Sequence, residues 1–194
     1  MKIDTQAQAQ LFTEAHSFNH FSDKAVSEET IRELYELMKW APTSMNTQPA
    51  RYVFIHSDEG KEKLIPALLD SNAEKTRKAP LTVIIAYDTE FYQHLGEQFP
   101  AYDAAPMFRA NNELAESTAF RNSSLQGAYL MMAARALGLD CGPMSGFDPE
   151  AVNQQFFADG QYKVNFIVNL GYGAEQGYHP RGPRLAFDQA AEII

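Results

Sequence analysis

The chain has 194 residues, 45% of them hydrophobic and 12% aromatic, which is enough for one domain over 1–194 or one protomer of an intertwined oligomer. Its net charge of −9 would repel a nucleic acid, so nucleic-acid binding is not expected. The single cysteine, Cys141, excludes an intrachain disulfide and a cysteine metal cluster, and is typical of a reducing compartment. A polar N-terminus and the lack of a long apolar run predict a cytoplasmic protein without membrane contact.

Hydrophobic spacing in the first half of the chain predicts two helices and two strands. A helix over 26–41 starts at Ser27 as N-cap and is ended by Pro42. A polar turn follows, and then a strand over 51–55. Ser57 caps a second helix over 58–69. After a short polar stretch, the continuous apolar run at Leu81–Asp88 predicts a central strand that is buried on both faces.

The second half contains one long helical pattern between less regular segments. An aromatic-rich segment over 90–112 is expected to be irregular and lid-like. The helix predicted over 113–137 has small residues on one face, Gly127 among them, and we expect another helix to pack closely there across a dimer interface. Asp148 and Pro149 begin a fourth helix that runs through Phe157, a buried strand is predicted over 163–173, and an extended arm over 174–194.

Familiar catalytic motifs are absent from the sequence. It has no GxGxxG after a strand, no Walker loop, no HExxH and no GxSxG. The sequence therefore does not support a Rossmann dinucleotide site, an NTPase, a zincin or an α/β-hydrolase. Only His16 and His20 have metal-ligand spacing. Because no third ligand lies nearby, we favour surface histidines and predict no metal site.

The polar turn over 42–49 reads "PTSMNTQP". Its hydroxyls at Thr43 and Ser44 and its amides at Asn46 and Gln48 both donate and accept hydrogen bonds, a mixture that suits a neutral heterocycle. An ordinary connecting loop is the alternative interpretation.

Four motifs in a fixed order make the chain similar to the nitroreductase family of flavin enzymes, over roughly 11–193. Residues 41–52 match the family's A-P-S-S-x-N-x-Q-P-x-x-F loop, and "NAEK" at 72–75 matches its Asn and Lys ahead of a buried strand. The long helix running into "ALGLDCGPMSGFD" and an Arg-Leu pair at 184–185 complete the match. Phrases such as "LYELMKWAPTS" and "NSSLQGAYL" resemble the malonic semialdehyde reductase subgroup of that family.

This resemblance implies an α+β fold with a central, mainly antiparallel sheet flanked by helices, in an intertwined homodimer. It also implies one FMN at each of two subunit interfaces, with the loop over 42–49 reaching the flavin of the partner. Arg184 would meet the phosphate, with Arg181 as a second basic residue, and 143–146 would face flavin N5. The implied FMN-binding residues are His16, Ser17, Asn19, Pro42, Thr43, Ser44, Asn46, Gln48, Asn72, Lys75, Pro143, Met144, Ser145, Gly146, Arg181 and Arg184.

The N-terminal phosphate motif departs from the family pattern. Where the family usually has two arginines around a Ser or Thr, this chain has His16, Ser17 and Asn19. A neutral imidazole supplies one hydrogen-bond donor, whereas a guanidinium is always charged and supplies several. Phosphate binding is therefore expected to be weaker or more pH-sensitive, unless Arg181 compensates. A plain surface position is the alternative for His16.

The resemblance further implies an oxidoreductase that uses NAD(P)H and FMN to reduce a small aldehyde, malonic semialdehyde, to 3-hydroxypropionate by a ping-pong scheme. Lys75 is expected to stabilise the charge that the flavin gains on reduction, although a solvated lysine is the alternative. Arg121 is expected to clamp the substrate carboxylate, or else to pair with an acidic residue across the dimer interface. A broad-specificity nitroreductase or quinone reductase and a flavin-binding protein without turnover are rival interpretations.

Overall fold

A computed structural model describes residues 1–175 and 177–194 and contains a four-stranded sheet in the order β1-β2-β4-β3. The strands are β1 (Ala50–Ile55), β2 (Leu81–Asp88), β3 (Asp140–Met144) and β4 (Tyr162–Gly171), and each pairs with its neighbours antiparallel. The α-helices are α1 (Thr5–Gln8), α2 (Glu28–Met38), α3 (Asp58–Leu64), α4 (Asp70–Lys78), α5 (Leu95–Gln98), α6 (Ala105–Arg109), α7 (Asn112–Ala136), α8 (Pro149–Phe156) and α9 (Phe187–Ala190). The predicted α+β class with an antiparallel sheet is confirmed.

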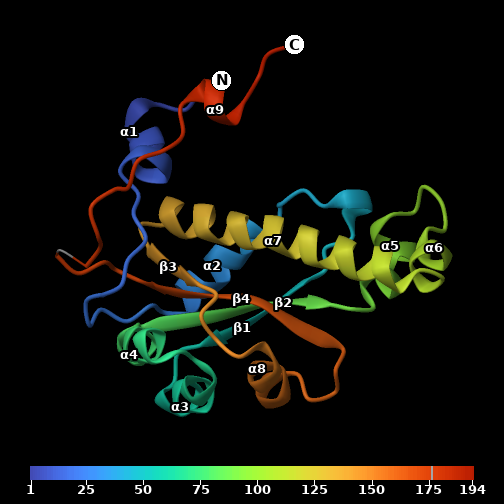
Figure 1. The fold of residues 1–194 in the computed structure, drawn as a ribbon, viewed down its shortest axis with the longest axis horizontal. Coiled ribbons are helices and arrows are strands. Elements are labelled where there is room, and N and C mark those ends of the chain that lie inside the picture. Colours follow the sequence, from blue (N-terminus) through green and yellow to red (C-terminus); the bar gives the residue numbers. More distant parts are fainter. Residues whose placement is uncertain (176) are drawn as a thin grey trace.

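Helices cover both faces of the sheet. Figure 1 shows α7, with α2 behind it, on one face, and α3, α4 and α8 on the other. Side chains alternate along β2 accordingly, because successive strand residues point to opposite faces. Val83 and Ile85 belong to the hydrophobic core with α2 and α7, whereas Ile84 and Ala86 belong to the core with α3 and α8. Every residue of β2 is buried, which confirms the prediction of a central strand.

The predicted helix caps are also confirmed. The Ser27 side chain accepts a hydrogen bond from the Thr30 N–H, and the Ser57 side chain accepts one from the Gly60 N–H. Asp148 caps α8 in the same way. These bonds satisfy N–H groups that the first helical turn leaves without an intrahelical partner. None of the described helices is both long enough and apolar enough to cross a membrane.

Among the elements that were not predicted from the sequence are α4 and β3. The polar stretch after residue 69 forms α4, whose only buried residue is Thr76, so it lacks the apolar periodicity that would have predicted a helix. The segment around Cys141 forms β3, although it contains Pro143. A proline is tolerated there because β3 lies at the edge of the sheet.

The segment over 90–112 is more regular than predicted. It contains a 3-10 turn at Phe91–His94 as well as α5 and α6. Phe91, Leu95 and Phe108 are buried in a hydrophobic cluster with Ala115 and Ala119 of α7. The segment therefore has a packed core of its own beneath the first turns of α7, and its role as a lid stays a prediction.

The C-terminal arm over 174–194 is extended except for α9, and it lies near the N-terminal segment (Figure 1). Residue 176 of this arm lies outside the described residues. Phe18 forms an isolated β-bridge with Tyr178, so the two ends of the chain are joined by backbone contacts.

The small-residue face of α7 packs on the sheet of its own chain, so the prediction of a second helix at Gly127 was wrong. A Cβ atom at Gly127 would lie 2.6 Å from Cε1 of Phe166 on β4 and 3.6 Å from Cγ2 of Ile85 on β2. Glycine thus lets α7 approach the sheet closely. The opposite face of α7 exposes Leu125 and Tyr129, and Phe120, on the sheet side near the Tyr87 ring, is also partly exposed.

We expect Gly127→Leu to destabilise the protomer, because a larger side chain at this position must displace Phe166. Overpacking of this kind costs about 1 to 3 kcal/mol of unfolding free energy. Urea unfolding of the ligand-free protein measures the effect, and Ala136→Leu, at an exposed position on the same helix, is the control. An unchanged midpoint for Gly127→Leu would contradict the close contact with the sheet.

Candidate functional site

A cationic cavity of about 480 Å³ lies between the N-terminal segment, the last turn of α7 and the C-terminal arm. Five of the residues implied to bind a phosphate line it together: His16, Ser17, Asn19, Arg181 and Arg184. Arg135 and His179 also line it, and neither was predicted from the sequence. Arg135 was missed because a cation in the last turn of a helix is readily explained by the helix dipole alone.

The arm and the N-terminal segment hold each other at this cavity. Nη2 of Arg181 donates hydrogen bonds of 2.8 Å to the carbonyl oxygens of Thr13 and Ala15. The His16 ring stacks on the Tyr178 ring with 4.0 Å between centroids. Contacts between the two ends of the chain therefore position Arg181 and His16 at the cavity.

One carboxyl group, that of Asp140, influences the cationic cavity. Its Oδ2 accepts a hydrogen bond of 2.9 Å from the Gly173 N–H. Burial raises the pKa of Asp140, and this effect outweighs the opposing effects of the Gly173 hydrogen bond and of the charges on Arg135 and His16. A carboxyl group whose charged form is disfavoured by burial thus interacts electrostatically with two cavity residues, Arg135 and His16.

A second group of implied site residues meets where α4 contacts the end of β3. Nδ2 of Asn72 donates a hydrogen bond of 3.0 Å to the carbonyl oxygen of Gly146. A Cβ atom at position 146 would lie 2.6 Å from the same Nδ2, so the contact requires glycine. Lys75, one turn along α4, is half-buried, Pro143 is exposed, and Ser145 is exposed as well.

β3 connects these two groups. Ser17 forms an isolated bridge with Cys141 at the start of the strand, and Met144 ends it. From Cys141 to Ser145 the chain advances roughly 13 Å at a strand rise of 3.3 Å per residue. This arrangement fits an elongated cofactor with an anionic end at the arginines and a polar ring near Asn72 and Lys75.

The loop over 42–49 is held by α7 and by α5. The Ser44 N–H donates a hydrogen bond of 2.8 Å to Oδ1 of Asn122. Nδ2 of Asn46 donates one of 2.9 Å to the carbonyl oxygen of Gln98, and Nε2 of Gln48 donates one of 3.0 Å to Oδ1 of Asn46. Pro42, Ser44 and Asn46 are exposed, so this loop displays polar groups at the surface.

The loop backbone is also strained. Met45 and Asn46 have φ of 50°, and Gln48 has φ of 40°, values that residues other than glycine seldom adopt. Such conformations persist where the surrounding structure fixes them, and they gather at functional sites. The strain supports a functional interpretation of the loop over that of an ordinary connection.

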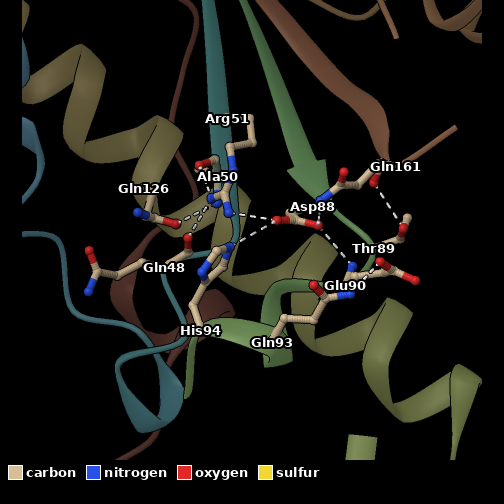
Figure 2. A network of polar contacts seen from close by, with 10 residues as sticks. All are labelled: Gln48, Ala50, Arg51, Asp88, Thr89, Glu90, Gln93, His94, Gln126 and Gln161. Atoms are coloured by element: carbon tan, nitrogen blue, oxygen red, sulfur yellow. Dashed lines mark hydrogen bonds and ion pairs between the residues drawn. The ribbon is translucent and has the colours of Figure 1, made fainter. Parts of the chain in front are cut away.

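A polar network fixes the end of the loop (Figure 2). Nη2 of Arg51 lies 2.6 Å from Oδ2 of the buried Asp88, and Nη1 of Arg51 donates a hydrogen bond of 3.0 Å to the carbonyl oxygen of Gln48. Oε1 of Gln126 on α7 accepts a hydrogen bond of 2.9 Å from the Ala50 N–H. No role for Asn122 or Gln126 was predicted from the sequence, although amides on an otherwise apolar helix face are a detectable signal.

One chain does not bring the loop to the cationic cavity. The loop contacts α7 at Asn122, whereas the cavity contacts α7 at Arg135. These positions are separated by roughly 20 Å along the helix at a rise of 1.5 Å per residue. The implied cofactor residues therefore form two sets, one at the cavity, β3 and α4, and the other on the loop.

Arg121 joins neither set. It is exposed on α7, and it forms no ion pair with any of the described residues. Its expected role as a substrate clamp stays a prediction. Within the described part of the chain, no three histidine, cysteine or acidic side chains are arranged to hold a metal ion.

Comparisons with a family model and with known proteins indicate the same family. The model of the family described as "Nitroreductase family" matches residues 13–172. A Ralstonia nicotianae protein that bears the name "putative NADH dehydrogenase/NAD(P)H nitroreductase" is 51% identical over 185 residues, 95% of each chain. A Polynucleobacter asymbioticus protein with the same name is 50% identical over 192 residues, 99% of this chain and 98% of its own. A nitroreductase-fold structure from Exiguobacterium sibiricum, in complex with FMN, superposes with a TM-score of 0.85 at 20% identity, covering 100% of this chain and 99% of its own.

Asp140→Asn should raise the midpoint of urea unfolding at pH 7, because it removes a half-buried charge and keeps an oxygen for the Gly173 N–H. A carboxyl group with a raised pKa contributes stability below its unfolded pKa and loses it as the pH rises through the folded pKa. The difference between variant and wild type should therefore shrink towards pH 3.5, roughly the range in which an unfolded Asp is protonated. A variant that is less stable at pH 7 would show that attraction to Arg135 and His16 outweighs burial.

Proposed function

Because the chain belongs to the nitroreductase family, we propose that it is an FMN-dependent NAD(P)H oxidoreductase. The observation that carries this proposal is the cavity that gathers His16, Arg181 and Arg184 at one end of β3, with Asn72 and Lys75 at the other. Three arginines line this cavity in a chain of net charge −9, a local reversal of sign that suits a phosphate group.

The residues of the site would divide the work of binding between them. Arg181 and Arg184 would neutralise the phosphate, and Asn72 and the backbone over 143–146 would hold the ring. The ammonium group of Lys75 would stabilise the negative charge that the flavin gains on reduction. FMN, when bound, supplies the hydride-transfer chemistry.

No side-chain nucleophile is needed for this reaction. Burial raises the pKa of Cys141 to about 12, so its thiol stays protonated near neutral pH. The role of the protein in the reaction is to orient the reactants and to stabilise charge.

The second element of the proposal is a homodimer with shared sites. Because the loop over 42–49 is held far from the cavity of its own chain, it would serve the cofactor of the partner. The exposed apolar side chains Phe120, Leu125 and Tyr129 on α7 support association, since they offer apolar area that a second chain can bury.

Mixing two defective variants tests both elements. Arg184→Ala damages the cavity, and Asn46→Ala damages the loop, so each homodimer should bind FMN weakly. In a shared-site dimer the heterodimer regains one intact site of two, so random mixing should restore about one quarter of all sites. FMN binding is measured by the change in flavin absorbance and fluorescence.

The same experiment has clear adverse outcomes. If mixing restores no FMN binding although both variants dimerise, each site is built from one chain. If the wild-type protein stays colourless after incubation with FMN, the flavin proposal itself fails. Released flavin should be FMN and not FAD.

For the substrate we propose malonic semialdehyde, reduced to 3-hydroxypropionate by a ping-pong scheme in which the nicotinamide leaves before the aldehyde enters. The supporting observation is the resemblance of "LYELMKWAPTS" and "NSSLQGAYL" to the malonic semialdehyde reductase subgroup. A broad-specificity nitroreductase or quinone reductase is the second candidate, and the names of the two bacterial relatives favour it. A flavin-binding protein without turnover would not be reduced by NAD(P)H.

Arg121→Ala should raise KM for the semialdehyde about tenfold or more while leaving an uncharged quinone nearly unaffected, because a guanidinium clamp acts on the carboxylate alone. Arg32→Ala, which removes an exposed arginine on α2, is the matched control for net charge. Equal losses for both acceptors would place Arg121 in the scaffold. Initial-rate lines that intersect would rule out the ping-pong scheme.

A further inference from the structure

We propose that Arg135 binds the cofactor phosphate and so supplies the permanent cation that the N-terminal motif lacks. This inference rests on the proposed function, since it assigns a residue to the phosphate end of the same site. It differs from the assignment of His16, Ser17 and Asn19, because Arg135 lies more than one hundred residues later, in the last turn of α7.

The position of Arg135 is the first support. Its side chain lines the cationic cavity together with His16, Arg181 and Arg184. Nη1 of Arg135 donates a hydrogen bond of 2.9 Å to the carbonyl oxygen of Leu11. This bond anchors one arm of the guanidinium on the N-terminal segment and leaves its other donors available.

An unsatisfied donor is the second support. Nε of Arg135 is buried and has no hydrogen-bond acceptor among the described residues. A buried donor on a charged group costs free energy unless an acceptor is present, so native structures seldom leave one unpaired. Arg135 also forms no ion pair within the described part of the chain, and its guanidinium therefore lacks a direct counter-ion.

The carboxyl group of Asp140 does not fill this need. It feels the charge of Arg135, but its Oδ2 is occupied by the Gly173 N–H and no contact within ion-pair distance joins the two side chains. A phosphate in the cavity would supply the missing charge and an acceptor for the guanidinium donors of Arg135 that line the cavity.

The other arginines of the cavity are less well prepared for this task. Nη2 of Arg181 is committed to the carbonyl oxygens of Thr13 and Ala15, and Nη1 of Arg184 to those of Gly182 and Pro183. Both arginines are exposed on the arm. Arg135 instead projects from a 25-residue helix, whose rigidity fixes the direction of its donors.

Comparing FMN with riboflavin isolates the phosphate. The two ligands share the same ring and ribityl chain, and only FMN carries the phosphate. For the flavin-free protein, Arg135→Met should weaken FMN binding roughly 10- to 100-fold, the range expected for hydrogen bonds to a charged group, and leave riboflavin binding unchanged. Arg135→Lys keeps the positive charge but loses the planar guanidinium, so its FMN affinity should lie between those of the wild type and of Arg135→Met.

Arg32→Met is the matched control, because it removes one exposed positive charge from α2, away from the cavity. It should leave the affinity ratio of FMN to riboflavin as in the wild type. Equal weakening of both flavins by Arg135→Met, or unchanged FMN affinity, would overturn the proposal. If Arg135→Met does not fold, the ratio for Arg135→Lys decides, since a purely structural arginine would leave that ratio unchanged. Failure of the wild-type protein to bind FMN would instead refute the proposed function.

Discussion

The buried carboxylate of Asp88 is the constraint on which the loop over 42–49 and its surroundings depend. Asp88 is fully buried at the end of β2, and its charge is compensated by Arg51 at 2.6 Å and by the Glu90 N–H at 2.9 Å. Loss of one partner of such a buried pair costs about 3 to 5 kcal/mol, because the remaining charge is uncompensated. Since Arg51 also donates to the carbonyl oxygen of Gln48, one ion pair joins β1, β2 and the end of the loop, and the segment over 90–112 begins from the same point.

This anchoring explains how the loop can hold an unfavourable backbone. Positive φ at Met45, Asn46 and Gln48 costs conformational energy that a free loop would release by relaxing. The hydrogen bond that the Ser44 N–H donates to Asn122 at the start of the loop, and the Arg51 network at its end, prevent that relaxation. A loop fixed in this way loses little further entropy when its exposed amides meet a ligand, so rigidity here favours binding.

The sequence predicted best those elements whose local signals agree with one another. The helix after Ser27 and the strand at β2 combine a cap or a turn with a clear apolar pattern, and both were found. β3 was not predicted because it contains a proline, and α4 was not predicted because its sequence is almost continuously polar. Small residues on α7 correctly indicated close packing but not the partner, since a glycine such as Gly127 admits a sheet as readily as a helix.

The site was predictable only where a motif is local. The loop over 42–49 and the pair Asn72 and Lys75 could be identified from residues close together in the sequence. The cationic cavity instead joins the N-terminal segment, α7 and the arm, so no spacing along the chain indicates Arg135. That construction has a physical consequence in a chain of net charge −9. An anion bound by cations from three distant segments binds only the state in which all three are assembled, and by mass action it stabilises that state. The cofactor proposed for this cavity would therefore hold the two ends of the chain against α7, in addition to its part in the chemistry.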